Sequence, residues 1–179
     1  MTEAARFCLK NREMSAEPLH YTMCGLDDIY LLNGFKIHET AHGRGVAVEN
    51  TDNLYKVIGI HLITCRKVLG PKDVKFLRKN MKFTQEELAV HLGVTSQTVA
   101  RYEKGLTDIP GPVDRLLRVC YAYNLLPPEQ KAAMIEELMV TMKNMEGMDE
   151  TGDDPVYFGS TGIDWNQATK VRSPLYEMA

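Results

Sequence analysis

The stretch that decides the fold is Phe83–Gly105, which reads Phe-Thr-Gln-Glu-Glu-Leu-Ala-Val-His-Leu-Gly-Val-Thr-Ser-Gln-Thr-Val-Ala-Arg-Tyr-Glu-Lys-Gly. Its pattern predicts two short helices joined by a tight turn. Thr84 is a good N-cap, and Glu87 three residues later completes a capping box. Gly93 can take the left-handed conformation that ends the first helix sharply. The stretch therefore predicts a helix-turn-helix.

Each of these helices carries one apolar face. Thr95 or Ser96 caps the second helix, and Gly105 ends it. The inward-facing residues, at helical spacing, are Leu88, Ala89, Leu92, Val99 and Tyr102. The outer face of the second helix keeps polar side chains that can hydrogen-bond base edges in a DNA major groove, namely Ser96, Gln97, Thr98 and Arg101.

The longer run Thr84-Gln85-x-x-Leu88-Ala89-x-x-Leu92-Gly93-Val94-Thr95-x-x-Thr98-Val99-x-x-Tyr102-Glu103-x-Gly105 resembles the Xre/Cro/cI helix-turn-helix family. The resemblance implies that Gln85 contacts the phosphate backbone, and a helix N-terminus does attract phosphate. It also implies that Arg78 pairs with Glu103 and locks the first helix of the domain to the recognition helix. The alternative is an ordinary helical hairpin that binds no nucleic acid.

The polar face suggests a division of labour on DNA. Gln97 can pair with adenine and Arg101 with guanine, each in bidentate fashion, although Arg101 is also placed to bind phosphate. Ser96 is a further base-edge candidate, whereas Thr98 can turn partly toward the first helix. The basic side chains expected on phosphates are Lys79, Lys82 and Lys104.

Charge is unevenly distributed along the 179 residues, whose formal net charge is -3. Residues 66–124 carry 11 basic and 6 acidic side chains, so the positive charge coincides with the helix-turn-helix. No apolar run is long enough to span a bilayer, and the N-terminus lacks the apolar segment of a signal peptide. We therefore expect a cytoplasmic protein that does not contact membranes.

The sequence predicts an α+β protein in four parts. Residues 1–17 are polar and are expected to form an N-terminal arm. Residues 18–66 carry short β-prone runs and a linking helix, with Asn33-Gly34 as a hairpin signal. Residues 67–144 contain five helices, including the helix-turn-helix. Residues 145–179 form an acidic tail, whose aromatic residues either stay solvated or dock on this chain or on a partner.

Family members of the resembled type usually dimerise, which places two recognition helices in successive major grooves. We therefore expect a homodimer that binds a palindromic operator and acts as a repressor. The fourth and fifth helices of the domain supply apolar residues that serve either the dimer or the domain's own core. These residues are Leu116, Cys120, Tyr121, Tyr123, Leu125 and Leu126.

The overall architecture resembles that of MqsA-type antitoxins, loosely before the helix-turn-helix and strongly over it. The matching runs are Leu69-Gly70-x-x-Val74-x-Phe76-Leu77-Arg78-Lys79 and Pro112-x-x-x-x-Leu117-Arg118. The resemblance implies an N-terminal module that binds a toxin. Zinc-binding members of that group hold the metal with Cys-x-x-Cys pairs, which this chain lacks. We therefore expect no metal and no cofactor, with the four cysteines as reduced thiols.

Catalysis is a weaker hypothesis. Asp27-Asp28, His38 and His42 include acid/base side chains, but nothing in the sequence fixes their geometry. We therefore expect no enzyme activity and no catalytic residues. The sequence predicts a DNA-binding transcriptional regulator, which is either the antitoxin of a toxin–antitoxin pair or a stand-alone regulator. The alternative is a protein-interaction module that uses the helix-turn-helix fold without specific DNA binding.

Overall fold

The computed structural model describes residues 5–40, 43–145 and 154–171, and these residues form two units. The first unit takes its described residues from 1–23, 27–57 and 154–179. The second takes them from 24–26 and 58–153. The division falls within one helix, between residues 57 and 58. Each unit is described separately below.

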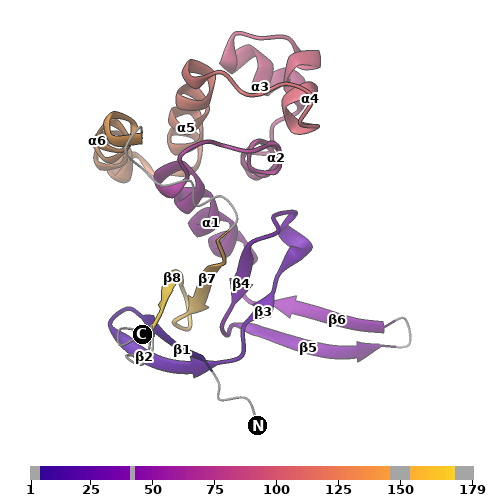
Figure 1. Cartoon of the computed structure of the whole chain (residues 1–179), viewed down its shortest axis with the longest axis vertical. Coiled ribbons are helices and arrows are strands. Elements are labelled where there is room, and N and C mark those ends of the chain that lie inside the picture. The colour runs from indigo at the N-terminus through magenta and orange to yellow at the C-terminus, as the bar shows by residue number, and fades with distance from the viewer. Residues whose placement is uncertain (1–4, 41–42, 146–153, 172–179) are drawn as a thin grey trace, which may run out of the picture. The chain divides into compact units, whose positions relative to one another are not determined.

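The first unit is built around a six-stranded sheet with the strand order β2-β1-β8-β7-β4-β3 (Figure 1). All neighbouring strands are antiparallel except β4 and β7, which are parallel. The strands of the sheet are β1 (Ala5–Leu9), β2 (Arg12–Ala16), β3 (Leu19–His20), β4 (Ile29–Leu31), β7 (Val156–Ser160) and β8 (Trp165–Lys170). A short 3-10 helix, η1 (Thr22–Cys24), precedes β4.

The described part of the N-terminal segment is not an arm, as the sequence suggested, but part of the sheet. Residues 5–16 form a hairpin in which Leu9 pairs with Arg12 across the two-residue turn Lys10-Asn11. Both turn residues have positive φ, 47° and 60°. Lysine rarely takes that conformation. The turn also lacks the glycine that usually marks a two-residue hairpin in a sequence. Phe7 is fully buried, which fixes this hairpin in the sheet.

The C-terminal segment, expected to form an acidic tail, also contains strands. Within its described residues it supplies β7 and β8, which fill the centre of the sheet between β1 and β4. Phe158 and Trp165 are buried there. Trp165 Nε1 donates to the carbonyl oxygen of Glu49 at 2.8 Å, and Trp165 N donates to Asn53 Oδ1 at 2.7 Å. Of the two alternatives for the aromatic residues, docking on the chain's own domain is the one observed. The acidic residues 146–153 lie outside the described residues.

The predicted Asn33-Gly34 hairpin is wrong in its pairing. Gly34 does take a positive φ of 73°, but the strands on its two sides diverge into different sheets. β4 pairs with β7, whereas β5 (Phe35–Thr40) pairs with β6 (Gly43–Val48) as a separate two-stranded ribbon. Asn33 instead bonds to β7, because its side chain contacts both the N and the O of Ser160, at 2.6 and 3.0 Å.

The second unit is helical. It contains the later part of α1 (Thr51–Cys65) and all of α2 (Pro71–Asn80), α3 (Gln85–Leu92), α4 (Ser96–Glu103), α5 (Gly111–Leu125) and α6 (Pro128–Asn144). The helices after residue 70 are thus the five that the sequence predicts over 67–144, and α1 is the linking helix. The α+β class is correct.

A buried ion pair holds the start of α5 against the end of α1. Arg118 and Asp114 are almost inaccessible to solvent, and Arg118 Nε lies 2.6 Å from Asp114 Oδ1. Arg118 Nη1 donates to the carbonyl oxygen of Ile63 at 2.8 Å. That carbonyl belongs to the last turn of α1, where carbonyl groups have no hydrogen-bond partner within their own helix. Asp114 Oδ2 also accepts from Leu69 N at 2.9 Å. Two charges are thus used to fix the entry into the helical domain.

Candidate nucleic-acid interface

The first helix of the helix-turn-helix, α3, begins at the predicted cap. Thr84 Oγ1 accepts from Glu87 N at 3.1 Å, and Glu87 Oε2 accepts from Thr84 N at 2.7 Å. The hydrogen bonds from Thr84 hold the pKa of Glu87 below its usual value. Gly93 ends the helix with a φ of 67°, which is the left-handed cap expected from the sequence. The turn geometry therefore follows from local residues alone.

The recognition helix, α4, begins at Thr95, whose hydroxyl accepts from Thr98 N at 3.1 Å. Its inner residues Val99 and Tyr102 are buried, as are Leu88, Ala89 and Leu92 of α3. α4 contacts both α2 and α3, and α3 also contacts α5. Because the inner side of α4 is packed in this way, the same residues always form its outer face.

That outer face carries the base-edge candidates. Ser96, Gln97 and Arg101 are exposed, whereas Thr98 is half-buried. The hydroxyl of Thr98 lies 2.8 Å from that of Thr95, so it takes part in the helix cap. Arg101 Nε donates to Thr107 Oγ1 at 3.1 Å in the loop that follows α4. Nothing in the sequence pointed to this contact, because Thr107 lies outside the regular pattern.

Arg78 and Glu103 are in direct contact in the structure. Arg78 Nε lies 2.5 Å and Nη2 3.0 Å from the two carboxylate oxygens of Glu103. Arg78 Nη1 also donates to the carbonyl oxygen of Phe83 at 2.8 Å. One guanidinium thus joins α2, the entry to α3 and the last residue of α4. Both side chains are largely buried, so this bidentate pair is sheltered from water.

Gln85 joins the same carboxylate. Its Nε2 donates to Glu103 Oε2 at 2.9 Å. Burial by itself would raise the pKa of Glu103. The hydrogen bonds from Arg78 and Gln85, together with the positive charges of Arg78 and Lys75, outweigh burial and hold that pKa below its usual value. The carboxylate therefore stays ionised and keeps both donors in place.

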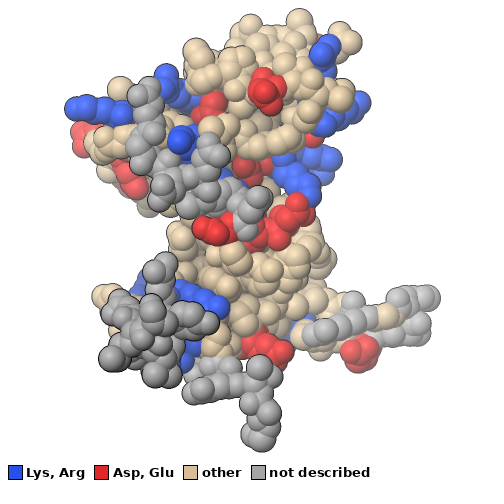
Figure 2. Space-filling view, in the orientation of Figure 1, with Lys and Arg blue, Asp and Glu red and all other residues tan. Residues whose placement is uncertain are grey.

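The lysines expected on phosphates are all exposed. Lys79 lies in the last turn of α2, Lys82 follows that helix with a φ of 61°, and Lys104 follows α4. Figure 2 shows Lys and Arg side chains on the side of the helical unit where α2 and α4 lie, and also on the side where α5 and α6 lie. Some of the basic residues of the sequence are thus exposed near the recognition helix.

The structure also sorts the apolar residues of α5 that the sequence could not divide. Tyr121 and Leu126 are buried in the core, and Leu117 and Ala122 join them. Leu116 and Tyr123 are exposed by 40% and 64%. Burial raises the pKa of the Tyr121 hydroxyl, which accepts a 2.7 Å hydrogen bond from Asn80 Nδ2.

Among the described residues there is neither a cluster of potential metal ligands nor a membrane-spanning helix. Within 5–40, 43–145 and 154–171, no three His, Cys, Asp or Glu side chains gather closely enough to hold a metal ion. None of the helices in those ranges has the length and apolar character needed to cross a lipid bilayer.

Comparison with known proteins identifies the domain. Residues 74–113 match the family model described as Helix-turn-helix, a range that covers most of α2, all of α3 and α4, and the start of α5. No curated protein and no solved structure matches the chain. The resemblance to MqsA-type antitoxins therefore stays a prediction. The chain carries a helix-turn-helix domain of the Xre type, and the protein is a DNA-binding regulator.

Proposed function

We propose that the protein is a sequence-specific transcriptional repressor that binds a palindromic operator as a homodimer. The observation that carries this proposal is the outer face of α4. Ser96, Gln97 and Arg101 are exposed on a helix whose other side is fixed by a buried core. A rigid helix with exposed hydrogen-bonding side chains is what major-groove recognition requires.

Base and backbone contacts are divided between two groups of residues. Gln97 and Arg101 read base edges, with Ser96 beside them. Lys79, Lys82 and Lys104 bind phosphates without regard to sequence. Thr98 is the weakest of the base candidates, because its hydroxyl is already engaged by Thr95.

Gln85 has a double role in this proposal. Its amide nitrogen carries two hydrogens, and one of them is directed to Glu103. The second N–H is available for a phosphate oxygen at the N-terminus of α3, where the helix dipole favours negative charge. The bond to Glu103 would then orient the group that binds phosphate.

Dimerisation is supported by exposed apolar side chains on the last two helices of the domain. Leu116 and Tyr123 of α5, and Met139 and Val140 of α6, are exposed by 40 to 64%. Dimeric helix-turn-helix proteins bind half-sites about 34–36 Å apart, and a dimer built on this surface has to meet that spacing. Replacement of Leu116 by Asp should shift the protein to a monomer in analytical ultracentrifugation. An unchanged mass would exclude this surface from the interface.

The decisive experiment is selection of bound sites from random duplex DNA with the full-length protein. A dimeric regulator should enrich a palindrome with half-sites one helical turn apart. Enrichment of a single half-site would remove the dimer from the proposal. No enrichment at all would favour the protein-interaction module.

Two substitutions then separate base reading from phosphate binding on the selected operator. Gln97→Ala should relax discrimination at one base position, by about 1–3 kcal/mol. Lys79→Ala should weaken operator and random DNA alike and reduce the salt slope by about one. Equal losses of Gln97→Ala on operator and on random DNA would reject the assignment of Gln97.

A partner protein, such as a toxin, is a second proposal, and the β5–β6 ribbon favours it. In the described residues β5 and β6 pair only with each other, so both outer edges carry backbone groups open to strand addition. If the product of an adjacent reading frame is the partner, it should copurify with this protein. Ile37→Asp on β5 should abolish copurification, whereas the same substitution at Val90 on α3, also exposed, should not.

A further inference from the structure

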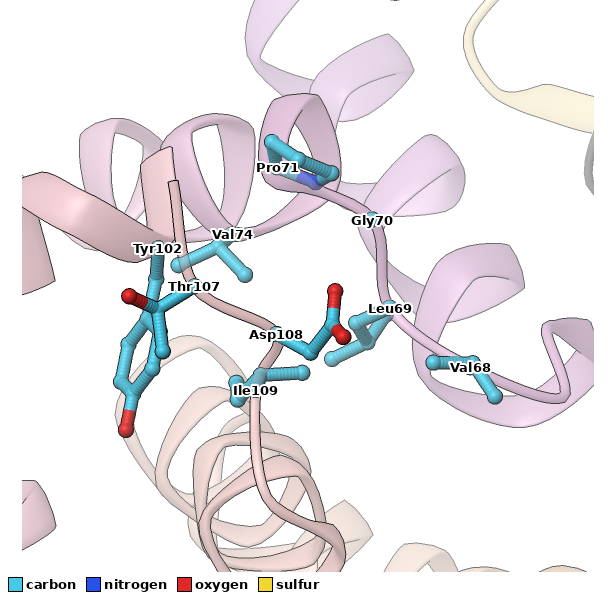
Figure 3. Close-up of a pocket in the computed structure, with 9 residues that line it drawn as sticks. All are labelled: Val68, Leu69, Gly70, Pro71, Val74, Tyr102, Thr107, Asp108 and Ile109. Atoms are coloured by element: carbon cyan, nitrogen blue, oxygen red, sulfur yellow. The ribbon is translucent and has the colours of Figure 1, made fainter. Parts of the chain in front are cut away.

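A small cavity lies directly behind the recognition helix (Figure 3). Its volume is about 180 Å³. It is lined by residues before and within the first turns of α2, by Tyr102 of α4, and by the loop that follows α4. The lining residues from α2 and the segment before it are Val68, Leu69, Gly70, Pro71 and Val74, and those from the loop are Thr107, Asp108 and Ile109.

The cavity has an apolar floor and one charged group at its rim. Leu69, Val74 and Tyr102 are buried and form the floor. Asp108 is exposed and is the only charged residue of the lining. In Figure 3 its carboxylate is directed toward the Leu69–Gly70 segment on the opposite side of the cavity. An apolar cavity of about 150 Å³ is known to hold a benzene molecule, so the volume fits a single ring.

These features define the ligand chemistry. The floor favours an apolar body about the size of one aromatic ring. The carboxylate of Asp108 favours a cationic group on the same molecule, and an ammonium on a short stem would reach it from the floor. The matching class is therefore a small apolar amine.

The cavity is also connected to the residues that read DNA. Thr107 lines it, and the hydroxyl of Thr107 accepts the 3.1 Å hydrogen bond from Arg101 Nε. Tyr102, whose ring forms part of the floor, is the next residue of α4. A ligand in the cavity would therefore contact both the loop that holds Arg101 and the helix that carries it.

We propose that this cavity is an effector site for a small apolar amine, and that its occupation tightens operator binding through Thr107 and Arg101. The amine packs the loop against α2 and α4 and neutralises the carboxylate of Asp108, the residue that follows Thr107. Arg101 is then held by an ordered Thr107. The regulatory half of this proposal rests on the proposed DNA-binding function, whereas the binding half does not.

Binding is tested first, with the full-length protein and without DNA. Benzylamine is titrated into the protein at millimolar concentrations by isothermal calorimetry, with benzyl alcohol as the neutral analogue. Benzylamine should bind saturably, and benzyl alcohol should bind up to about fivefold more weakly, because it lacks the pairing with the exposed carboxylate of Asp108. Asp108→Asn should weaken benzylamine by a similar factor. Asp164→Asn, which changes an exposed carboxylate of the first unit, should leave its affinity unchanged.

Coupling is tested next, on the operator returned by selection. Saturating benzylamine should tighten operator binding about fivefold or more, the lower end of typical allosteric coupling. Thr107→Val removes the hydroxyl that accepts from Arg101 Nε, so it should lose most of this gain when operator affinity is compared at benzylamine concentrations that saturate the variant. Absence of saturable binding, or binding indifferent to Asp108→Asn, would overturn the site. Binding without a change in operator affinity would overturn the regulation. If selection returns no operator, the proposed function fails, while calorimetry still decides whether the site exists.

Discussion

The side-chain amide of Gln85 donates a 2.9 Å hydrogen bond to Glu103 Oε2, which ties the first residue of α3 to the last residue of α4. The same carboxylate receives the guanidinium of Arg78 from α2. Three helices of the DNA-binding domain therefore meet at one buried negative charge. We therefore expect the orientation of α4 to depend on this junction.

Removal of Arg78 should destabilise the domain strongly. Arg78→Ala leaves Glu103 buried without its main counter-charge, and breaking a buried pair in this way costs about 3–5 kcal/mol. The expected result is a lower free energy of unfolding in urea, followed by far-UV circular dichroism. Lys79→Ala changes an exposed residue of the same helix and should cost less than about 0.5 kcal/mol. Equal losses for the two variants would show that the Arg78–Glu103 pair makes no specific contribution to the free energy of unfolding.

The stability supplied by Glu103 should be lost in acid. The folded state holds the pKa of Glu103 below 4.5, its usual value, so protonation favours the unfolded chain. The contribution is fully present above that value and disappears as the pH falls through the lower pKa of the folded state. Glu103→Gln should therefore reduce stability at pH 7 and show a smaller acid-dependent loss than the unsubstituted protein. Parallel stability curves from pH 7 to pH 3 would contradict the assignment.

Gly59→Ala should destabilise the helical unit, although alanine is the better helix former. A Cβ at Gly59 would lie 1.7 Å from the hydroxyl oxygen of Tyr121, a buried side chain of α5. Overpacking of this kind costs about 1–3 kcal/mol. Gly111→Ala is the matched control, because a Cβ there has no neighbour within 4 Å. Urea unfolding should show a loss for the first variant and little change for the second. A gain in stability for Gly59→Ala would mean that α1 and α5 pack less closely than the structure shows.

Asn33 should be important for the first unit alone. Its side chain makes two hydrogen bonds to the backbone of Ser160, so Asn33→Ala leaves both backbone groups without that partner. The expected cost is about 1–3 kcal/mol. Trp165 is the only tryptophan of the chain and is buried in this unit, so its fluorescence follows the unfolding of this unit.

The control for this prediction is Lys36→Ala, which removes an exposed ion pair with Glu49 and should cost less than about 1 kcal/mol. In both variants the helical far-UV circular dichroism signal of the second unit should be lost at the same point as in the unsubstituted protein. A fluorescence transition that is unchanged in Asn33→Ala would reject the role of Asn33 in joining the strands.

The helix-turn-helix could be predicted because its signals are local. The Thr84–Glu87 capping box, the left-handed Gly93 and the buried positions of α3 and α4 each depend on residues within a few positions of one another. The outer face of α4 then follows from helical periodicity. Contacts between residues far apart in the domain were harder to predict from the sequence. The Arg78–Glu103 pair came from family resemblance, and the contact of Arg101 with Thr107 had no signal in the sequence.

The sequence by itself thus determined the α+β class, the five helices after residue 70 and the polar outer face of α4, because caps, glycines and apolar spacing act over one or two helical turns. Only the tertiary structure decided that residues 5–16 and 156–170 enter one sheet. Asn33 and Ser160 are separated by 127 positions, and no periodicity in either segment specifies such a partner. Tertiary structure likewise decided that Arg118 and Asp114 are buried. Charged residues four positions apart on a helix usually face water, and only packing against the end of α1 makes this pair internal.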